Sequence, residues 1–175
     1  MLKSFRILPF LAVFTACTST PEVEDTQPTS WSTDQSVEMN QRFAFEQEVE
    51  IKVYLKRHPE LEMKKTETGL QYDIYKDSAG PTIQEDEVAH VKFLIQLLDE
   101  DTVYQSEGNT TSSFKVDKSD VELGLHQGIK MMSVGDRAKF IMPSHLAHGL
   151  LGDMQEIPPL EVIVADIELT AITSK

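Results

Sequence analysis

The histidines and the single cysteine are the residues of this chain whose types suit metal or nucleophilic chemistry. His145 and His148 stand three positions apart, as two metal ligands on one helical turn do, but their segment has the character of a loop and offers no obvious third ligand. The other histidines are scattered, and no set of titratable residues converges. We therefore expect no metal and no cofactor, and we set aside an acid–base or metal hydrolase. Cys17 has no second cysteine with which to form an intramolecular disulfide.

The residues before Cys17 indicate a different chemistry for its thiol. An apolar run at residues 7–16 follows Lys3 and Arg6, and it spans about ten residues where a membrane-crossing helix needs about twenty. This is the pattern of a signal peptide that is removed from the mature protein. We expect the signal peptide to comprise residues 1–16.

The segment Phe14-Thr15-Ala16-Cys17 resembles the lipobox of bacterial lipoproteins, with Phe where Leu is usual. The resemblance implies lipid attachment at Cys17 and a protein anchored in the bacterial cell envelope, facing either the periplasm or the cell surface. Thr18 rather than Asp follows the cysteine, which favours the outer membrane in the usual sorting pattern. The alternative is a plain secretory signal cut near Ala16, with Cys17 left as an ordinary thiol.

The overall charge restricts the partners. The chain has 29 acidic and 16 basic residues, a formal net charge of -13 at pH 7. Such a surface repels nucleic-acid phosphates and anionic lipid headgroups, so we expect no nucleic-acid partner and no membrane contact except through the lipid on Cys17. Basic, extended or loosely folded polypeptides are attracted instead.

The elements that position a site begin after a polar segment. Residues 17–34 are mostly Thr, Ser, Pro, Glu, Asp and Gln, a composition that predicts a disordered tether. Residues 35–68 predict a helical arm, because apolar residues recur at steps of three and four from 35 to 57 and Pro59 then ends the helix. The helix is compatible with a homodimer and with folding back on the domain that follows.

Beyond Gly69 the apolar residues alternate, which indicates strands. Residues 69–175 therefore predict one α+β domain, in which an antiparallel, twisted sheet wraps one short helix. The strands are expected at 70–75, 91–98, from 103, at 137–142 and at 162–171, with the helix at 123–132 and a polar loop at 108–113.

The C-terminal region resembles the FKBP-type peptidyl-prolyl cis–trans isomerases in three stretches. Gly124 to Gly135 is similar to the family's helix and the turn after it. Pro143 to Pro159 is similar to its long active-site loop, and Ile163 to Leu169 to its last strand. The lipobox, the helical arm and residues 66–72 together resemble the lipoprotein branch that is associated with gliding motility.

The resemblance implies catalysis without a nucleophile. Rotation about an X-Pro bond meets a barrier of about 20 kcal/mol, because the planar amide loses resonance as it twists. A twisted amide has less charge separation, so a dry apolar cleft that binds it preferentially speeds the rotation. The implied function is a peptidyl-prolyl isomerase that assists the folding of envelope or secreted proteins, with proline-containing client polypeptides as partners.

The pocket that the resemblance implies is only partly of the family's kind. Phe93 stands where Tyr is usual and Tyr104 where Phe is usual, Val121 is a matching aliphatic, and Ile157 matches the residue whose backbone N–H meets the substrate. The departures are Gln105 for Asp, Leu125 for Trp, His148 for Tyr and Ala165 for Phe, with Glu122 where an Ile lines the family's pocket.

These departures predict low isomerase activity and weak binding of the family's macrolide inhibitors. They remove an anionic group, a hydroxyl donor and one wall of the cleft. The alternative function is a catalytically silent module of the same fold, which uses the cleft or the helical arm to hold a partner or client.

Overall fold

The computed structural model describes residues 32–174, so the expected signal peptide, Cys17 and most of the expected tether lie outside the described residues. Within this range the chain forms two α-helices, one short 3-10 helix and seven strands. In chain order they are α1 (Thr33–Arg57), β1 (Lys64–Lys65), β2 (Gln71–Lys76), β3 (Val88–Leu97), β4 (Thr102–Gln105), β5 (Ser112–Lys115), α2 (Leu123–Ile129), β6 (Arg137–Met142), η1 (Ser144–Leu146) and β7 (Ile163–Thr173).

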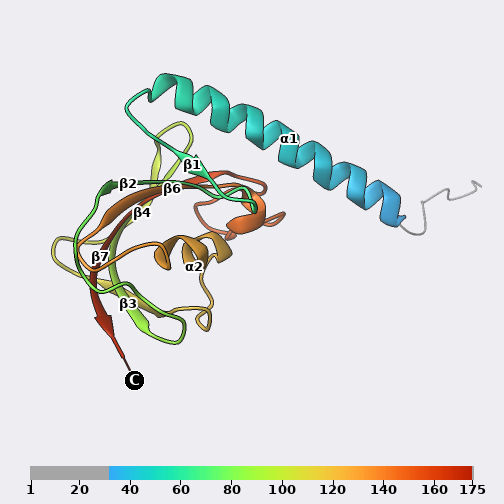
Figure 1. The fold of residues 1–175 in the computed structure, drawn as a ribbon. Helices are drawn as coiled ribbons and strands as arrows, with labels where there is room; N and C mark the ends of the chain where they lie inside the picture. The colour runs from blue at the N-terminus through green and yellow to red at the C-terminus, as the bar shows by residue number, and fades with distance from the viewer. Residues whose placement is uncertain (1–31, 175) are drawn as a thin grey trace, which may run out of the picture. The chain divides into compact units, whose positions relative to one another are not determined.

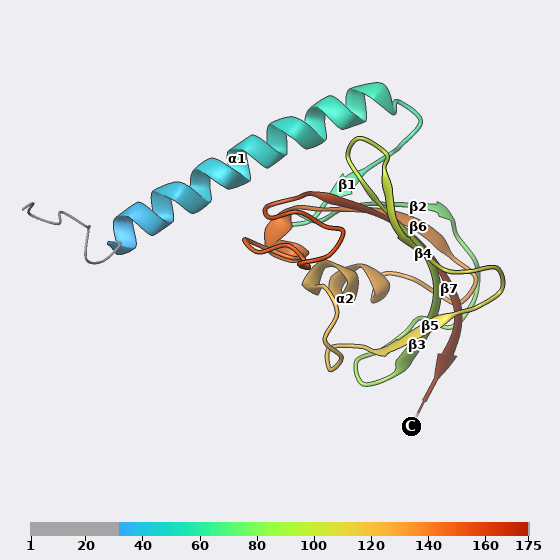
Figure 2. The ribbon, with the colours of Figure 1, turned by 180° about the vertical axis from the view of Figure 1, so that it is seen from behind.

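The strands form one antiparallel sheet in the order β1-β2-β6-β7-β3-β4. Along one edge of β3, β5 pairs with the first half and β4 with the second half, while β7 pairs with its whole other edge. The sheet curves around α2 (Figures 1 and 2). The expected α+β fold, a twisted antiparallel sheet around one short helix, is confirmed.

Helix α2 lies close to β6 because two of its residues are glycines. A Cβ added to Gly128 would lie 2.6 Å from the ring of Phe140, and one added to Gly124 would lie 2.5 Å from the sulfur of Met142. Ile129, at the end of the helix, is fully buried in the same core. The glycines therefore set the distance between the helix and the sheet.

Helix α1 is the helix that the sequence places at 35–57, and it begins two residues earlier, at Thr33. It buries Gln47, Ile51 and Tyr54, which recur at helical spacing on one face. Ile51 and Tyr54 form a second core with residues that include Ile141. Because successive side chains of a strand point to opposite faces, Ile141 lies on the face of the sheet opposite to its neighbour Phe140. The sheet is thus covered by α2 on one face and α1 on the other.

Several expected boundaries are wrong. The second helix ends at Ile129, since the backbone then turns with bonds that span three residues, Met131 to Gly128 and Met132 to Ile129. The expected polar loop at 108–113 stops at Thr111, because Ser112 already pairs with β3. The last strand continues to Thr173, two residues past the expected end.

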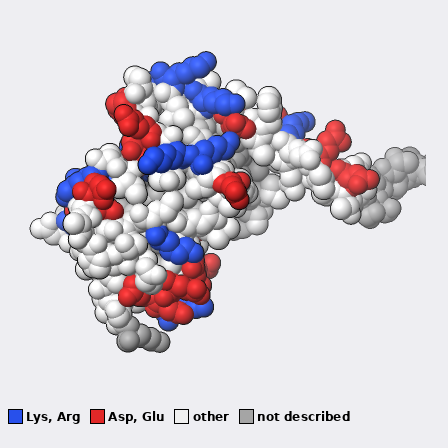
Figure 3. Space-filling view, in the orientation of Figure 1, with Lys and Arg blue, Asp and Glu red and all other residues white. Residues whose placement is uncertain are grey.

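The surface carries charges of both signs. On the face in Figure 3, acidic and basic side chains lie among one another. Ion pairs occur between such side chains, for example between Arg137 and Glu168 at 2.8 Å. Neither helix in the part of the chain that the structure describes is long and apolar enough to cross a bilayer.

Candidate active site

An apolar cleft of about 300 Å³ lies between the sheet and the beginning of α2. Strands β3, β4, β5 and β7 supply most of its wall, and the segment that leads into α2 supplies the rest. The apolar lining is Val91, Phe93, Ile95, Tyr104, Phe114, Val121, Leu125 and Ile167, and the polar lining is Gln105, Ser112, Ser113 and Glu122.

The strand pattern explains why these residues meet. Val91, Phe93 and Ile95 are alternate residues of β3 and therefore share one face of the sheet. Tyr104 is the register partner of Ile95 in β4, so its ring continues the same wall. A period of two in the sequence is thus enough to build this side of the cleft.

The segment that leads into α2 is fixed by a buried histidine. The backbone N–H of Asp117 donates to Nδ1 of His126 at 3.0 Å, and Nε2 lies 3.0 Å from the carbonyl oxygen of Ser119. Because Nδ1 accepts, the ring proton is on Nε2 and is donated to Ser119. Phe114 packs edge-on against the same ring. These contacts hold the chain that brings Val121 into the cleft.

Five of the eight residues that the sequence predicts for the site line this cleft, and three do not. The five are Phe93, Tyr104, Gln105, Val121 and Leu125. The roles of all eight in catalysis stay predictions.

Ala165 and Ile157 are both buried outside the lining of the cleft. Ala165 is fully buried in the core and pairs across the sheet with Ile95 and Phe140. Ile157 is 3% exposed, and its backbone N–H donates to Oδ1 of Asp153 at 2.8 Å. The N–H that the resemblance assigns to a substrate is therefore bonded within the loop.

Asp153, which the sequence did not single out, links the long loop to the wall of the cleft. Its carboxylate accepts hydrogen bonds from the hydroxyl of Tyr104 and from the backbone N–H groups of Gln155 and Ile157. These bonds stabilise the anion and lower the pKa of Asp153 to about 2, and the bond from Tyr104 has the largest effect. The same bond raises the pKa of Tyr104, because the neutral hydroxyl is the donor.

His148 makes a second link between the loop and the cleft. Its Nε2 lies 3.0 Å from a carboxylate oxygen of Glu122, and the two side chains are 25% and 24% exposed. Glu122 lines the cleft, so His148 reaches the rim through a charged partner rather than by facing the hollow itself.

The two histidines of the loop do not converge on a common point. Nε2 of His145 lies 2.9 Å from the carbonyl oxygen of Thr68, whereas His148 faces Glu122. Between residues 32 and 174, no group of three or more His, Cys, Asp or Glu side chains is arranged to hold a metal ion.

Sequence reasoning missed Asp153, which bonds to the wall of the cleft, and six residues of the lining, namely Val91, Ile95, Ser112, Ser113, Phe114 and Ile167. A weak signal for Asp153 was available, because an Asp after a glycine in a loop commonly accepts the N–H two residues further on, here that of Gln155. Phe114 gave no such signal, since it borders the stretch that was expected to be a polar loop.

The curved antiparallel sheet, the short helix packed against it and the cleft between them define an α+β domain whose cleft has a mainly apolar lining. A family model described as FKBP-type peptidyl-prolyl cis-trans isomerase matches residues 80–170. The chain belongs to this family.

Two curated relatives extend the likeness. The FKBP-type peptidyl-prolyl cis-trans isomerase FkpA of Aeromonas hydrophila is 34% identical over 110 residues, which are 63% of this chain and 40% of that protein. The probable FKBP-type isomerase FkpA of Neisseria meningitidis serogroup B is 31% identical over 110 residues, with the same shares. The match thus covers less than half the length of these relatives.

Solved structures agree on the fold. The crystal structure of FkpA from Escherichia coli has a TM-score of 0.65 and 25% identity, and the match covers 79% of this chain and 64% of that one. The crystal structure of AtFKBP13 has a TM-score of 0.61 at 22% identity and covers 64% of this chain and 99% of that one.

Proposed function

We propose that this chain is a peptidyl-prolyl cis–trans isomerase that acts on proline bonds in extended polypeptides. The observation that carries the proposal is the cleft of about 300 Å³, in which Phe93, Tyr104, Val121 and Leu125 face one hollow. Apolar walls of this kind suit a proline ring and disfavour the charge separation of a planar amide. Membership of the family supports the same reaction.

Catalysis in this cleft rests on preferential binding of the twisted amide. The uncatalysed barrier is about 20 kcal/mol, and each 1.4 kcal/mol or so of preferential binding is worth about a tenfold rate increase. Leu125 gives the cleft an aliphatic floor, and Phe93 and Tyr104 give it aromatic walls. Gln105 adds an amide with two N–H donors at the lining, which is a source of hydrogen bonds for substrate carbonyls.

A second candidate is a binding module of the same fold with weak or no isomerase activity. Two observations favour it. The N–H of Ile157 is already bonded to Asp153, and the carboxylate of Glu122 stands where an apolar wall is expected. A site of this kind holds a client segment without a strong preference for its twisted form.

We further propose that the protein is a lipoprotein attached through Cys17 to the outer membrane of a bacterial envelope, where it assists the folding of secreted or envelope proteins. The apolar run at 7–16 and the lipobox support the anchor. Residues 66–72 support a place in the gliding-motility branch. The net charge of -13 favours basic or loosely folded clients over nucleic acids.

A homodimer through α1 is a further part of the proposal. Val37, Phe45, Val49 and Val53 are large apolar residues that stay exposed on this helix. They are separated by multiples of four positions and therefore form one stripe that winds slowly around it. We propose that the stripes of two copies pack together.

An isomerisation assay tests the function. The chain without the residues before Thr18 is added to short prolyl peptides that differ in the residue before proline, and the rate is followed against enzyme concentration. We expect Leu125→Gln to lower kcat/KM about tenfold or more, because it places a polar amide on the floor of the cleft. Leu123→Gln changes a residue of the same helix that is 55% exposed, and it is the matched control. A rate no better than solvent at high enzyme concentration favours the binding module.

A further inference from the structure

We propose that Gln47 of α1 is a positioning residue, which holds the long loop between β6 and β7 in the form that the cleft requires. This loop comprises residues 143–162, between the end of β6 at Met142 and the start of β7 at Ile163. The proposal rests on the isomerase function proposed above. Gln47 lies outside the family match, which begins at residue 80, so the proposal assigns a role to a residue that the matched segment does not contain.

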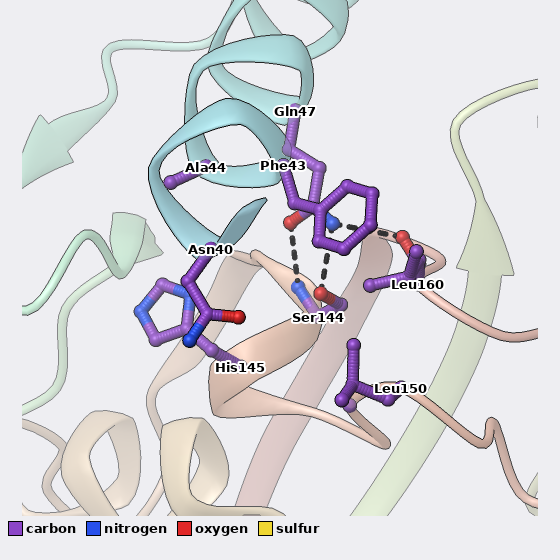
Figure 4. A pocket seen from close by; sticks show the side chains of 9 residues that line it. Asn40, Phe43, Ala44, Gln47, Ser144, His145, Leu150 and Leu160 are labelled. Carbon is purple, nitrogen blue, oxygen red and sulfur yellow. Dashed lines mark hydrogen bonds between the residues drawn. The ribbon is translucent and has the colours of Figure 1, made fainter. Parts of the chain in front are cut away.

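The side chain of Gln47 is 5% exposed and uses its whole amide on the loop. Nε2 donates to Oγ of Ser144 at 2.8 Å and to the carbonyl oxygen of Leu160 at 2.9 Å. Oε1 accepts the backbone N–H of Ser144 at 3.0 Å. Figure 4 shows these three bonds at the point where α1 meets the loop. Only one orientation of the amide satisfies all of them.

The residues that Gln47 binds are the two stems of the loop, and backbone bonds join them to its middle. The N–H of Gly149 donates to the carbonyl oxygen of Ser144 at 2.8 Å, and the N–H of Leu160 donates to that of Gly149 at 2.9 Å. Leu160 has φ +62, a conformation that residues with a Cβ rarely adopt. The bond from Gln47 to its carbonyl group therefore supports a strained turn.

This hydrogen-bond network of Gln47, Ser144, Gly149 and Leu160 positions both links from the loop to the cleft. His148, which faces Glu122, directly precedes Gly149. Asp153, which accepts the hydroxyl of Tyr104, lies between Gly149 and Leu160. A shift of this network moves both links, and small displacements of positioning groups have large effects on the rate of catalysis.

Close packing does not replace these bonds. A cavity of about 370 Å³ surrounds the contact, with Asn40 and Phe43 of α1 on one side and Leu150 of the loop on the other (Figure 4). Leu150 is itself exposed. At this end of α1 the hydrogen bonds of Gln47 are thus the main tie to the loop, whereas Ile51 and Tyr54 bind the helix to the sheet further along.

The test compares Gln47→Met with Gln41→Met in the full-length chain. Met keeps the length and volume of Gln but loses its hydrogen bonds, and Gln41 is an exposed glutamine of the same helix. For Gln47→Met we expect kcat/KM to fall about tenfold, with the circular dichroism spectrum unchanged. Amide hydrogen exchange should become faster at residues 148–157 and stay the same in β3 and α2. Gln41→Met should match the wild type in every measurement.

Wild-type kcat/KM together with wild-type exchange in a folded Gln47→Met variant would overturn the proposal. If Gln47→Met does not fold, Ser144→Ala takes its place, because it removes only the hydroxyl that accepts from Gln47. We then expect a smaller change in the same direction, and no change at all overturns the proposal.

If the wild-type chain has no isomerase activity, the proposed function fails by itself, and the exchange rates of the loop alone decide the role of Gln47.

Discussion

The hydroxyl of Tyr104 and the carboxylate of Asp153 join the wall of the cleft to the long loop, across 49 positions of the sequence. The family resemblance implied an anionic group at position 105 and a hydroxyl donor at position 148, and this chain has Gln105 and His148 there. Tyr104 now brings a hydroxyl to the strand side, and Asp153 brings the anion to the loop side. Both polar groups are thus present beside the cleft and bonded to each other, although Asp153 does not line it.

The lowered pKa of Asp153 predicts a dependence of stability on pH. Its pKa is about 2 in the folded chain against an ordinary value of 3.8, so the folded state favours the anion. This contribution to stability is fully present above about pH 4 and is lost as the pH falls toward 2. Tyr104→Phe removes the largest cause, so we expect the pKa of Asp153 to rise toward its ordinary value when carboxyl resonances are titrated by NMR.

Tyr75→Phe is the matched control for this titration. Tyr75 donates its hydroxyl to Asp166 at 2.7 Å and has no bond to Asp153. Its loss should leave the pKa of Asp153 unchanged. An equal shift in the two variants, or no shift in Tyr104→Phe, would show that the hydroxyl of Tyr104 does not stabilise this anion.

Five lining residues, including the polar Gln105, were predictable from the sequence, whereas the contacts that link the long loop to the cleft were not. Alternation along β3 and the family resemblance together placed Phe93, Tyr104, Val121 and Leu125, because a repeat of two and a helical turn are local properties. Asp153 depends on a partner in a distant strand, and His148 on the rotation of a loop. Such contacts arise only from the folded chain.

At the scale of elements, the contact between α2 and β6 depends on Gly128, where helix propensity and packing have opposite effects on stability. Gly128→Ala adds about 1 kcal/mol of helix propensity. The new Cβ, however, lies 2.6 Å from the fully buried ring of Phe140, and overpacking of a core costs about 1–3 kcal/mol. The packing cost is the larger, so we expect a net loss of up to about 2 kcal/mol in the free energy of unfolding, measured with urea.

Leu123→Ala tests whether this loss is specific to the buried face of α2. Leu123 is exposed at the start of the helix, and its truncation should change the free energy of unfolding by no more than about 0.5 kcal/mol. A Gly128→Ala variant as stable as the wild type would mean that Phe140 moves aside at little cost.

The exposed stripe of α1 predicts a monomer–dimer equilibrium. Val49→Gln together with Val53→Gln makes the stripe polar without altering the charge, so we expect the dimer to be lost in sedimentation equilibrium experiments. Glu50→Gln, at an exposed position of the same helix, should leave the dimer intact. A wild-type chain that sediments as a monomer at all concentrations contradicts the proposed dimer.

The existence of the elements followed from periodicity, whereas some of their ends did not. The expected helix at 35–57 and strand at 137–142 correspond to α1 and β6, because long repeats dominate local preferences. The polar residues Ser112 and Ser113 become part of β5, since β3 offers them backbone partners. Composition alone carries no information about such a partner.

At the scale of the whole molecule, the attachment through Cys17 is the prediction with the widest consequence. This residue lies outside the described part of the chain. We expect the wild-type protein to stay with the membrane fraction after a high-salt wash, because acyl chains and not charges hold it. Cys17→Ala should be released, and Ser19→Ala should behave as the wild type. A Cys17→Ala variant that stays membrane-bound after the wash contradicts the anchor.

The position of β7 also determines whether the sheet is able to form. This strand is the last element of the chain, yet it lies between β6 and β3 and pairs with both along their length. Until β7 is in place, the two halves of the sheet have unpaired edges, a state prone to misassociation. A chain that is cut before Ile163 lacks the strand that joins the two halves, so it should not form this sheet.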